Sequence, residues 1–149
     1  MKSQTPKVAP VTNQGLKIMN VKEEKFEGQL SMELTNMILT PNQLVGLDEM
    51  DIKQVVNRRK GKAFIFKQEE EDGPTFMKNS FKVLKEKEEV KGSKYILISI
   101  QTTGSTLNME DMNHINDFMD SLEDDFELKW GIAQLEEKAK MCIILLASK

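Results

Sequence analysis

Two carboxylates three residues apart, Asp48 and Asp51, are the first pair in the sequence whose types and spacing could do chemistry. Carboxylates can act as general acids or bases when a structure holds them beside a reacting group. The same spacing also has a structural explanation: Asp48 would cap a helix that follows it, and Asp51 would lie in the first turn, near the positive end of the helix dipole. Helix capping alone accounts for both residues.

The other residues with reactive side chains are isolated in the sequence. His114 is the sole histidine, so neither a histidine metal cluster nor a histidine dyad can be built around it, and we expect it on a helix surface. Cys142 is the sole cysteine and lies in the apolar run 141–147, where a lone thiol is typically a small buried hydrophobe. The hydroxyl-rich stretch 102–106 could bind an anion, but a plain turn explains it better. The chain is therefore expected to have no catalytic residues, no metal site and no cofactor.

Composition limits the class of protein. A chain of 149 residues with 39% hydrophobic and 30% charged residues matches one folded domain. A net charge of -3 with mixed signs gives no footprint for a phosphate backbone, so nucleic acid is not an expected partner. The first fifteen residues contain no apolar stretch for a secretory signal, and the longest apolar run is too short to span a bilayer. These features predict a cytoplasmic protein with no membrane partner.

The N-terminal half predicts an arm followed by two helices. Residues 1–25 are polar and contain prolines, which indicates a flexible arm with one short strand around residues 16–21. Apolar residues recur at helical spacing from Phe26 to Thr40, where Pro41 ends the pattern. A second helix is predicted from Asp48, with Gly61 as its stop.

The C-terminal half predicts strands and helices in alternation. Strands are expected at 63–66 and 95–100, and the continuous apolar character of the second indicates a central strand covered on both faces. Helices are expected from Pro74 to Gly92 and from a cap at Asn108 to Leu122. Two last strands, 126–130 and 141–147, are predicted to form a hairpin. The sum is an α+β fold of two layers with helices on one side of a sheet.

Three segments resemble, in order, the C-terminal domain of FtsZ, the bacterial relative of tubulin. They are LVGLDEMDIKQVV (44–56), KGSKYILISIQTTGSTLNMEDMNHINDFM (91–119) and FELKWGIAQLEEKAKMCIILLAS (126–148). The resemblance implies a four-stranded mixed sheet with helices on one face, with a flexible arm at 1–25 and the FtsZ C-terminal-like domain at 26–149. Nothing in the chain resembles the GGGTGTG phosphate loop of that family, so we expect no GTP binding and no enzyme activity.

The resemblance also implies a surface for a protein partner. Asp48 and Asp51 align with the two aspartates of the family's synergy loop, which reaches the nucleotide of a neighbouring subunit and helps to position the attacking water. The expected partner-binding residues are Leu47, Asp48, Glu49 and Asp51. The chain would then be a non-catalytic protein-binding domain that docks on an FtsZ-like filament in cell division and modulates it.

Two alternatives stay open. One is a self-assembling, chorismate-mutase-like oligomer with a small-molecule site between subunits, whose carboxylate binding would depend on Arg58 and Arg59, the only arginines. The other is a scaffold unrelated to division. The ten methionines could also form an adaptable binding surface, although most have helical core spacing, which favours core filling.

Overall fold

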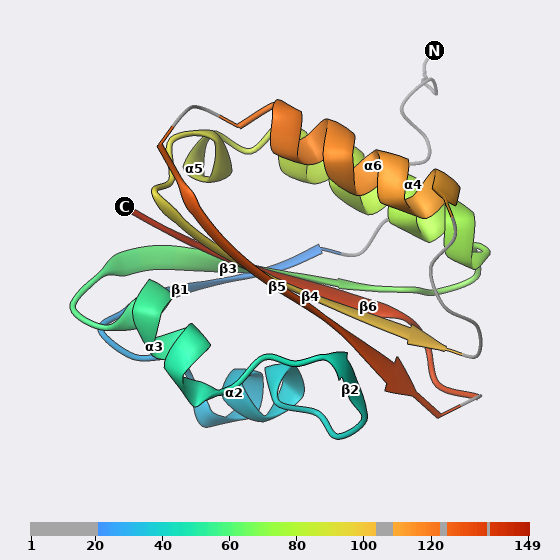
Figure 1. Ribbon diagram of the computed structural model, residues 1–149, viewed down its shortest axis with the longest axis horizontal. Coiled ribbons are helices and arrows are strands. Elements are labelled where there is room, and N and C mark those ends of the chain that lie inside the picture. Colours follow the sequence, from blue (N-terminus) through green and yellow to red (C-terminus); the bar gives the residue numbers. More distant parts are fainter. Residues whose placement is uncertain (1–20, 104–108, 123–124, 137) are drawn as a thin grey trace, which may run out of the picture.

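Three strands with nearly continuous apolar sequence lie side by side in the middle of the sheet: β3 (Lys60–Lys67), β6 (Cys142–Ser148) and β4 (Tyr95–Thr103). The computed structural model describes residues 21–103, 109–122, 125–136 and 138–149. Within these residues the sheet has three more strands, β1 (Val21–Glu27), β2 (Gln43–Val45) and β5 (Glu127–Leu135), and the six lie in the order β1-β3-β6-β4-β5-β2 (Figure 1). β4 and β5 are parallel and the other neighbours are antiparallel, so the sheet is mixed.

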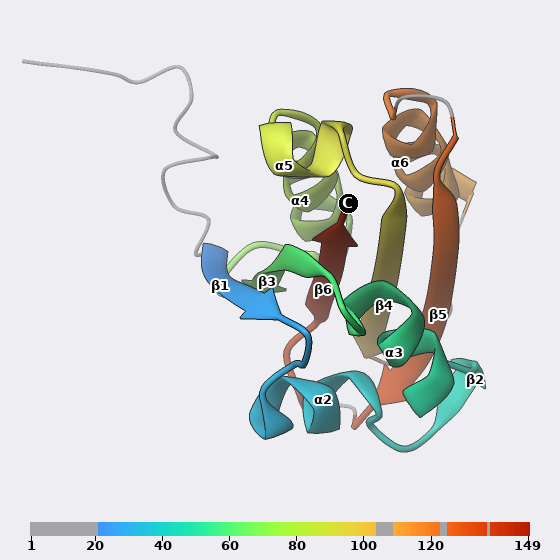
Figure 2. The same ribbon diagram turned by 90° about the vertical axis from the view of Figure 1, so that its left-hand side faces the viewer.

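Helices cover both faces of this sheet, which gives three layers (Figures 1 and 2). Helices α4 (Gly73–Lys85), α5 (Glu88–Lys91) and α6 (Met109–Asp120) lie over one face, and α2 (Met32–Ile38) and α3 (Glu49–Val56) lie over the other. The central strands are apolar at successive positions because successive side chains point to opposite faces, and both faces are buried.

Each face has its own apolar core. On the α4–α6 face, Phe64 and Phe66 of β3 join the side chains of α4 and α6, and the rings of Phe81 and Phe118 lie 5.5 Å apart. On the α2–α3 face, Ala63 and Ile65 of the same strand join the side chains of α2 and α3. The two cores are thus separated by the sheet, and each is closed by its own helices.

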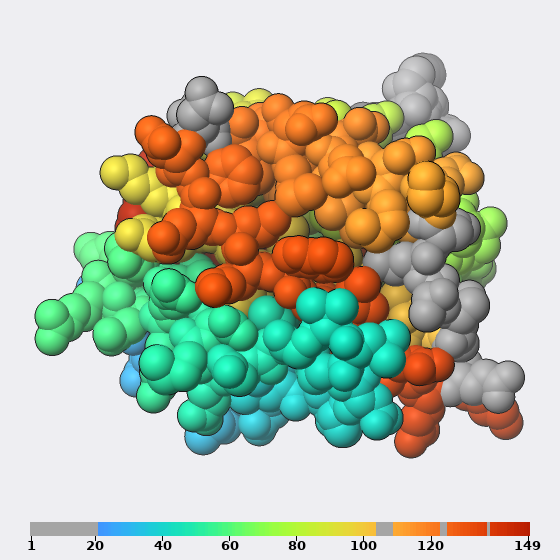
Figure 3. Space-filling view, in the orientation of Figure 1, coloured from blue at the N-terminus to red at the C-terminus, as the bar shows by residue number. Residues whose placement is uncertain are grey.

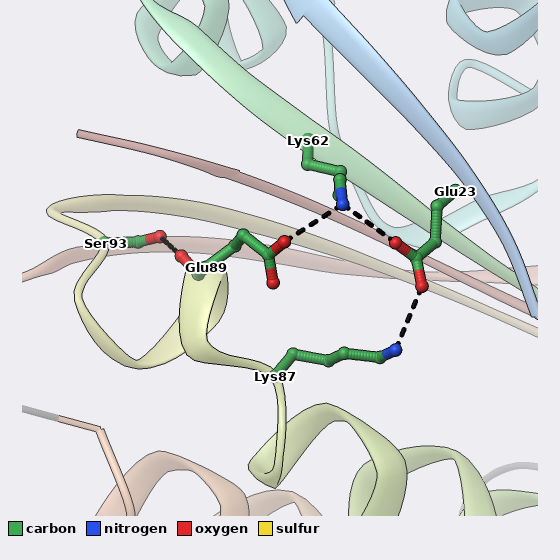
Figure 4. A network of polar contacts seen from close by, with 5 residues as sticks. All are labelled: Glu23, Lys62, Lys87, Glu89 and Ser93. Carbon is green, nitrogen blue, oxygen red and sulfur yellow. Dashed lines mark hydrogen bonds and ion pairs between the residues drawn. The ribbon is translucent and has the colours of Figure 1, made fainter.

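The edge strand β1 (Val21–Glu27) carries more charged residues than any central strand, five of its seven. An ion network fastens β1 to the molecule (Figure 4): Lys62 of β3 lies 2.9 Å from both Glu23 of β1 and Glu89 of α5, and Lys87 lies 2.9 Å from Glu23. The Ser93 hydroxyl donates a hydrogen bond to the carbonyl of Glu89. Hydrogen bonds from the two lysines hold the pKa of Glu23 below its usual value, and the two carboxylates raise the pKa of Lys62.

Several predictions of secondary structure are wrong. The helix predicted from Phe26 begins only at Met32, because Phe26 belongs to β1, and residues 21–25 of the predicted arm also lie in that strand. The rest of the arm, and most of the predicted strand at 16–21, lie outside the described residues. Gly61 is not a helix stop but a residue of β3. A side chain there would place its Cβ only 2.5 Å from the ring of Phe26.

The predicted sheet is also corrected. It has six strands rather than four, since β1 and the short β2 (Gln43–Val45) add an edge on each side, and helices cover both faces rather than one. β5 and β6 do not form a hairpin, because β4 lies between them. The closing apolar run forms β6, and all of its residues are buried because the strand lies in the middle of the sheet, where both faces are covered. The central position predicted for 95–100 is confirmed by β4, and the α+β class is confirmed as well.

Candidate protein-docking site

The segment between α2 and α3 is held in place by buried amides. Gln43 in β2 donates its side-chain NH₂ to the carbonyl of Ile38 at 3.1 Å and to that of Thr40 at 2.7 Å. Gln101 of β4 donates to the carbonyl of Met37 at 2.7 Å. These bonds satisfy carbonyls at the end of α2, which have no partner within the helix. The start of the segment is therefore fixed to the sheet.

Leu47 anchors the middle of the same segment. Its side chain is only 6% exposed and belongs to the core of the α2–α3 face. It packs over Gly131 of β5, where an added Cβ would lie 2.7 Å from the Cγ of Leu47 and 2.6 Å from the carbonyl oxygen of Val45. Only glycine lets the segment approach the strand so closely. β2 thus pairs with the edge of β5, and the Leu47 side chain packs against one face of the same strand.

Asp48 and Asp51 form a reciprocal cap at the start of α3. The Asp48 carboxylate accepts from the backbone N–H of Asp51 at 3.0 Å, and the Asp51 carboxylate accepts from the backbone N–H of Asp48 at 3.0 Å. This capping box satisfies backbone N–H groups at the helix start and places negative charge near the positive end of the helix dipole. The structural explanation of the two aspartates is confirmed.

Large apolar side chains surround this anchored segment on the outside. Leu44 and Val45 of the edge strand β2 are 52% and 41% exposed, and Met50 in the first turn of α3 is 68% exposed. Val45 pairs with Ile132 of β5, two residues from Trp130, which is 37% exposed. Figure 3 shows the β2 region in cyan beside β5 in red-orange on one face of the molecule. We call these four residues, Leu44, Val45, Met50 and Trp130, the edge patch.

The predicted partner-binding residues separate into two groups. Leu47 is buried and holds the segment from inside, while Asp48, Glu49 and Asp51 lie at the start of α3, with Glu49 exposed. The exposed apolar residues beside them were not predicted individually. An exposed apolar residue on a strand near the edge of a sheet gives the same sequence signal as one in the core, so only the structure reveals the exposure of Trp130.

Other predicted residues lie elsewhere. His114 is half-buried on α6. Cys142 is buried in β6, and desolvation raises the pKa of its thiol to about 11. Arg59 makes a cation–π contact within the chain, because its guanidinium lies 3.6 Å from the centre of the Tyr95 ring. Of the hydroxyl-rich stretch, 104–106 fall outside the described residues. Among the methionines that the structure describes, Met77 fills the core as expected, whereas three are strongly exposed: Met32, Met50 and Met109.

The described residues form neither a metal site nor a membrane-spanning helix. Within the described part of the chain, no three or more His, Cys, Asp or Glu side chains are grouped so that they could hold a metal ion. None of the described helices is long and apolar enough to cross a membrane.

The fold is similar to that of FtsZ from M. jannaschii. An empty FtsZ dimer matches with a TM-score of 0.54 and 19% sequence identity, over 75% of this chain and 34% of that chain. A mutant FtsZ from the same organism matches with a TM-score of 0.51 and 16% identity, over 81% of this chain and 42% of that chain. The fold is FtsZ-like.

The similarity to FtsZ is one of fold and covers only part of the FtsZ chain. No protein-family model matches the sequence, and no curated protein matches it. This chain spans well under half the length of the FtsZ chains that it resembles. The resemblance to FtsZ expected from the sequence is confirmed at the level of the fold, and the activity of FtsZ does not follow from it.

Proposed function

We propose that this chain is a non-catalytic protein-binding domain that docks through the edge patch on an FtsZ-like GTPase and limits its assembly, with a role in cell division. The observation that carries the proposal is the edge patch itself: large apolar side chains are exposed on β2, in the first turn of α3 and on the neighbouring β5, beside a segment that hydrogen bonds hold in place. Large apolar side chains exposed on neighbouring elements are typical of protein interfaces.

The partner class is supported by the fold. One similar structure is of an FtsZ dimer, so a protein of this fold does associate with a like subunit. A domain that docks through one face on the end of a filament would block the addition of the next subunit at that end. Filaments grow by head-to-tail addition of subunits at their ends, so a small amount of a domain that blocks one end should limit filament length.

The aspartates at the start of α3 give the proposed domain, at most, an assisting role in hydrolysis. Each carboxylate already accepts a backbone hydrogen bond in the capping box. We propose that the two aspartates hold the first turn of α3 in place at the surface where the partner docks. The chain alone should not turn over GTP.

The test is polymerisation of an FtsZ GTPase, with M. jannaschii FtsZ as the probe, followed by sedimentation and phosphate release. Stoichiometric amounts of this chain should lower both polymer mass and GTP turnover. Met50→Glu should abolish the effect, because it places a charge in the edge patch. Met109→Glu is the matched control, since Met109 is also strongly exposed, at 79% against 68% for Met50, but lies on α6, on the other face.

Unchanged polymer mass and turnover at stoichiometric excess would refute docking on this GTPase. An equal loss of effect in both methionine variants would instead refute the edge patch as the docking surface. No observation specifically favours the small-molecule site between subunits, because Arg59 is already stacked on Tyr95.

A further inference from the structure

A second surface lies on the opposite side of the sheet, in a groove between α4 and α6. The groove encloses about 600 Å³ and is lined by residues of both helices. Lys78, Lys82 and Lys85 come from α4, and His114 and Asp117 come from α6. Its floor includes Phe81, whose ring packs against Phe118 and so ties the two helices together beneath the groove. We call it the α4–α6 groove.

The three lysines form one exposed row along α4. They are four and three residues apart, which places them on the same helical face. The other face of α4 is buried, with Phe76, Met77 and Leu84 in the core, so the row is held in a fixed orientation. A rigid helix therefore presents three ammonium groups in a line.

Among the residues that the structure describes, no ion pair neutralises the charges of the row. In the described residues the ion pairs involve Lys60, Lys62, Lys87 and Lys91, and none involves the three lysines of the groove. The carboxylates that line the groove are Glu86 and Asp117, so three lysines face two acidic groups. The groove is locally positive on a chain whose net charge is -3.

We propose that the α4–α6 groove binds an acidic segment of a partner protein. The spacing of the row suits such a segment: Lys78 and Lys82 are about 6 Å apart along the helix axis at about 1.5 Å per residue. Alternate residues of an extended peptide are about 6.6 Å apart on one side. Carboxylates at alternate positions would therefore meet Lys78 and Lys82, while Lys85, about 4.5 Å further along the axis, would reach the same or the next carboxylate through its flexible side chain.

An acidic peptide fits the groove better than a nucleic acid does. Glu86 and Asp117 would repel the continuous charge of a phosphate backbone, and the net negative charge of the chain opposes long-range attraction of a polyanion. A peptide can place its carboxylates over the lysines and a neutral residue over each acid. The mixture of lysines and acidic residues in the groove therefore favours a peptide with spaced negative charges over a polyanion with continuous charge.

The test uses a fluorescein-labelled peptide of ten residues in which glutamate alternates with serine, titrated with the whole chain and followed by anisotropy. Binding should weaken at least about tenfold when Lys78→Gln, Lys82→Gln and Lys85→Gln are combined, since each exposed ion pair contributes a few-fold. The matched control combines Lys22→Gln, Lys25→Gln and Lys94→Gln, which removes the same charge from exposed lysines outside the groove. The control variant should bind as the wild type does.

Amide chemical shifts in NMR spectra locate the peptide independently. Peptide-dependent changes should fall on residues 78–86 and 114–117, and circular dichroism melts should show that both variants remain folded. The proposal is overturned if the peptide does not bind, if both triple variants weaken it equally, or if the changes map elsewhere. It is also overturned if a single-stranded RNA of equal charge binds the groove more tightly than the peptide.

Discussion

Gly131 is the point at which the docking segment is most sensitive to change. In Gly131→Ala the new methyl group would lie 2.6 Å from the carbonyl oxygen of Val45 and 2.7 Å from the Cγ of Leu47. The oxygen belongs to the backbone and cannot rotate away, so either β2 and Leu47 must move off β5 or the strand must shift. Overpacking of this kind costs about 1–3 kcal/mol, and we expect the free energy of unfolding to fall by that amount.

Gly46→Ala is the matched control for this change. Gly46 lies in the same segment, its φ is not in the left-handed region, and an added Cβ would meet no atom within 4 Å. Its effect on stability should stay within about 0.5 kcal/mol, because an exposed substitution of this kind disturbs no packing. The two variants thus make the same chemical change, with and without the clash.

Urea denaturation and amide hydrogen exchange measure the two consequences separately. Gly131→Ala should lower the unfolding free energy, or lower the exchange protection of amides in β2 if the segment moves instead, and it should weaken docking on the GTPase. Gly46→Ala should do neither. If Gly131→Ala leaves both stability and protection as in the wild type, the close approach of the segment to β5 is not the constraint described above.

Three further predictions concern the rest of the molecule. Glu23→Gln should lower stability at pH 7 by about 0.5–1 kcal/mol, since this carboxylate pairs with Lys62 and Lys87. Because the pKa of Glu23 in the folded chain lies below its ordinary value of 4.5, that contribution is present above pH 4.5 and is lost as the pH falls through the lowered pKa. In urea titrations the stabilities of the wild type and Glu23→Gln should therefore differ at pH 7 and lie closer together at pH 3. A constant difference at both pH values would contradict this. Phe118→Ala should cost about 3–5 kcal/mol in the same titration, because the ring is fully buried, and a loss below about 1 kcal/mol would show that the two helices repack freely. Cys142, with a pKa of about 11, should react with a thiol reagent at pH 8 only after unfolding in urea, and rapid labelling of the folded chain would disprove its burial.

The elements that could be predicted from the sequence are those whose signal is local. β4 has a continuous apolar run, and α3 begins with a capping box that the spacing of Asp48 and Asp51 already indicates. β1 could not be predicted in this way, because Phe26 is the one buried residue in an otherwise mostly charged sequence. It is a strand because β3 pairs with it and because Lys62 neutralises Glu23, and both partners are distant in the sequence.

The same distinction explains the candidate site. The sequence identified the loop at 44–51, but it could not separate Leu47, which is buried, from Leu44, which is exposed. That difference depends on residues far along the chain. Leu47 is buried because Gly131 of β5 leaves room for its side chain, and Leu44 is exposed because it lies on β2, the edge strand that pairs with β5. The same six-strand order leaves Trp130 near the sheet edge, so the docking surface is a product of the topology.

The topology also separates the edge patch from the α4–α6 groove. β2 and α3 supply most of the edge patch, the groove is built only from α4 and α6, and the sheet lies between α3 and those two helices. The two surfaces share no residue, and their helices belong to different apolar cores. Substitutions in separate sites without shared partners act additively on binding. The lysine substitutions in the groove should therefore leave docking on the GTPase unchanged, and Met50→Glu should leave peptide binding unchanged. Such independence would let the domain hold an acidic partner while it occupies the end of a filament.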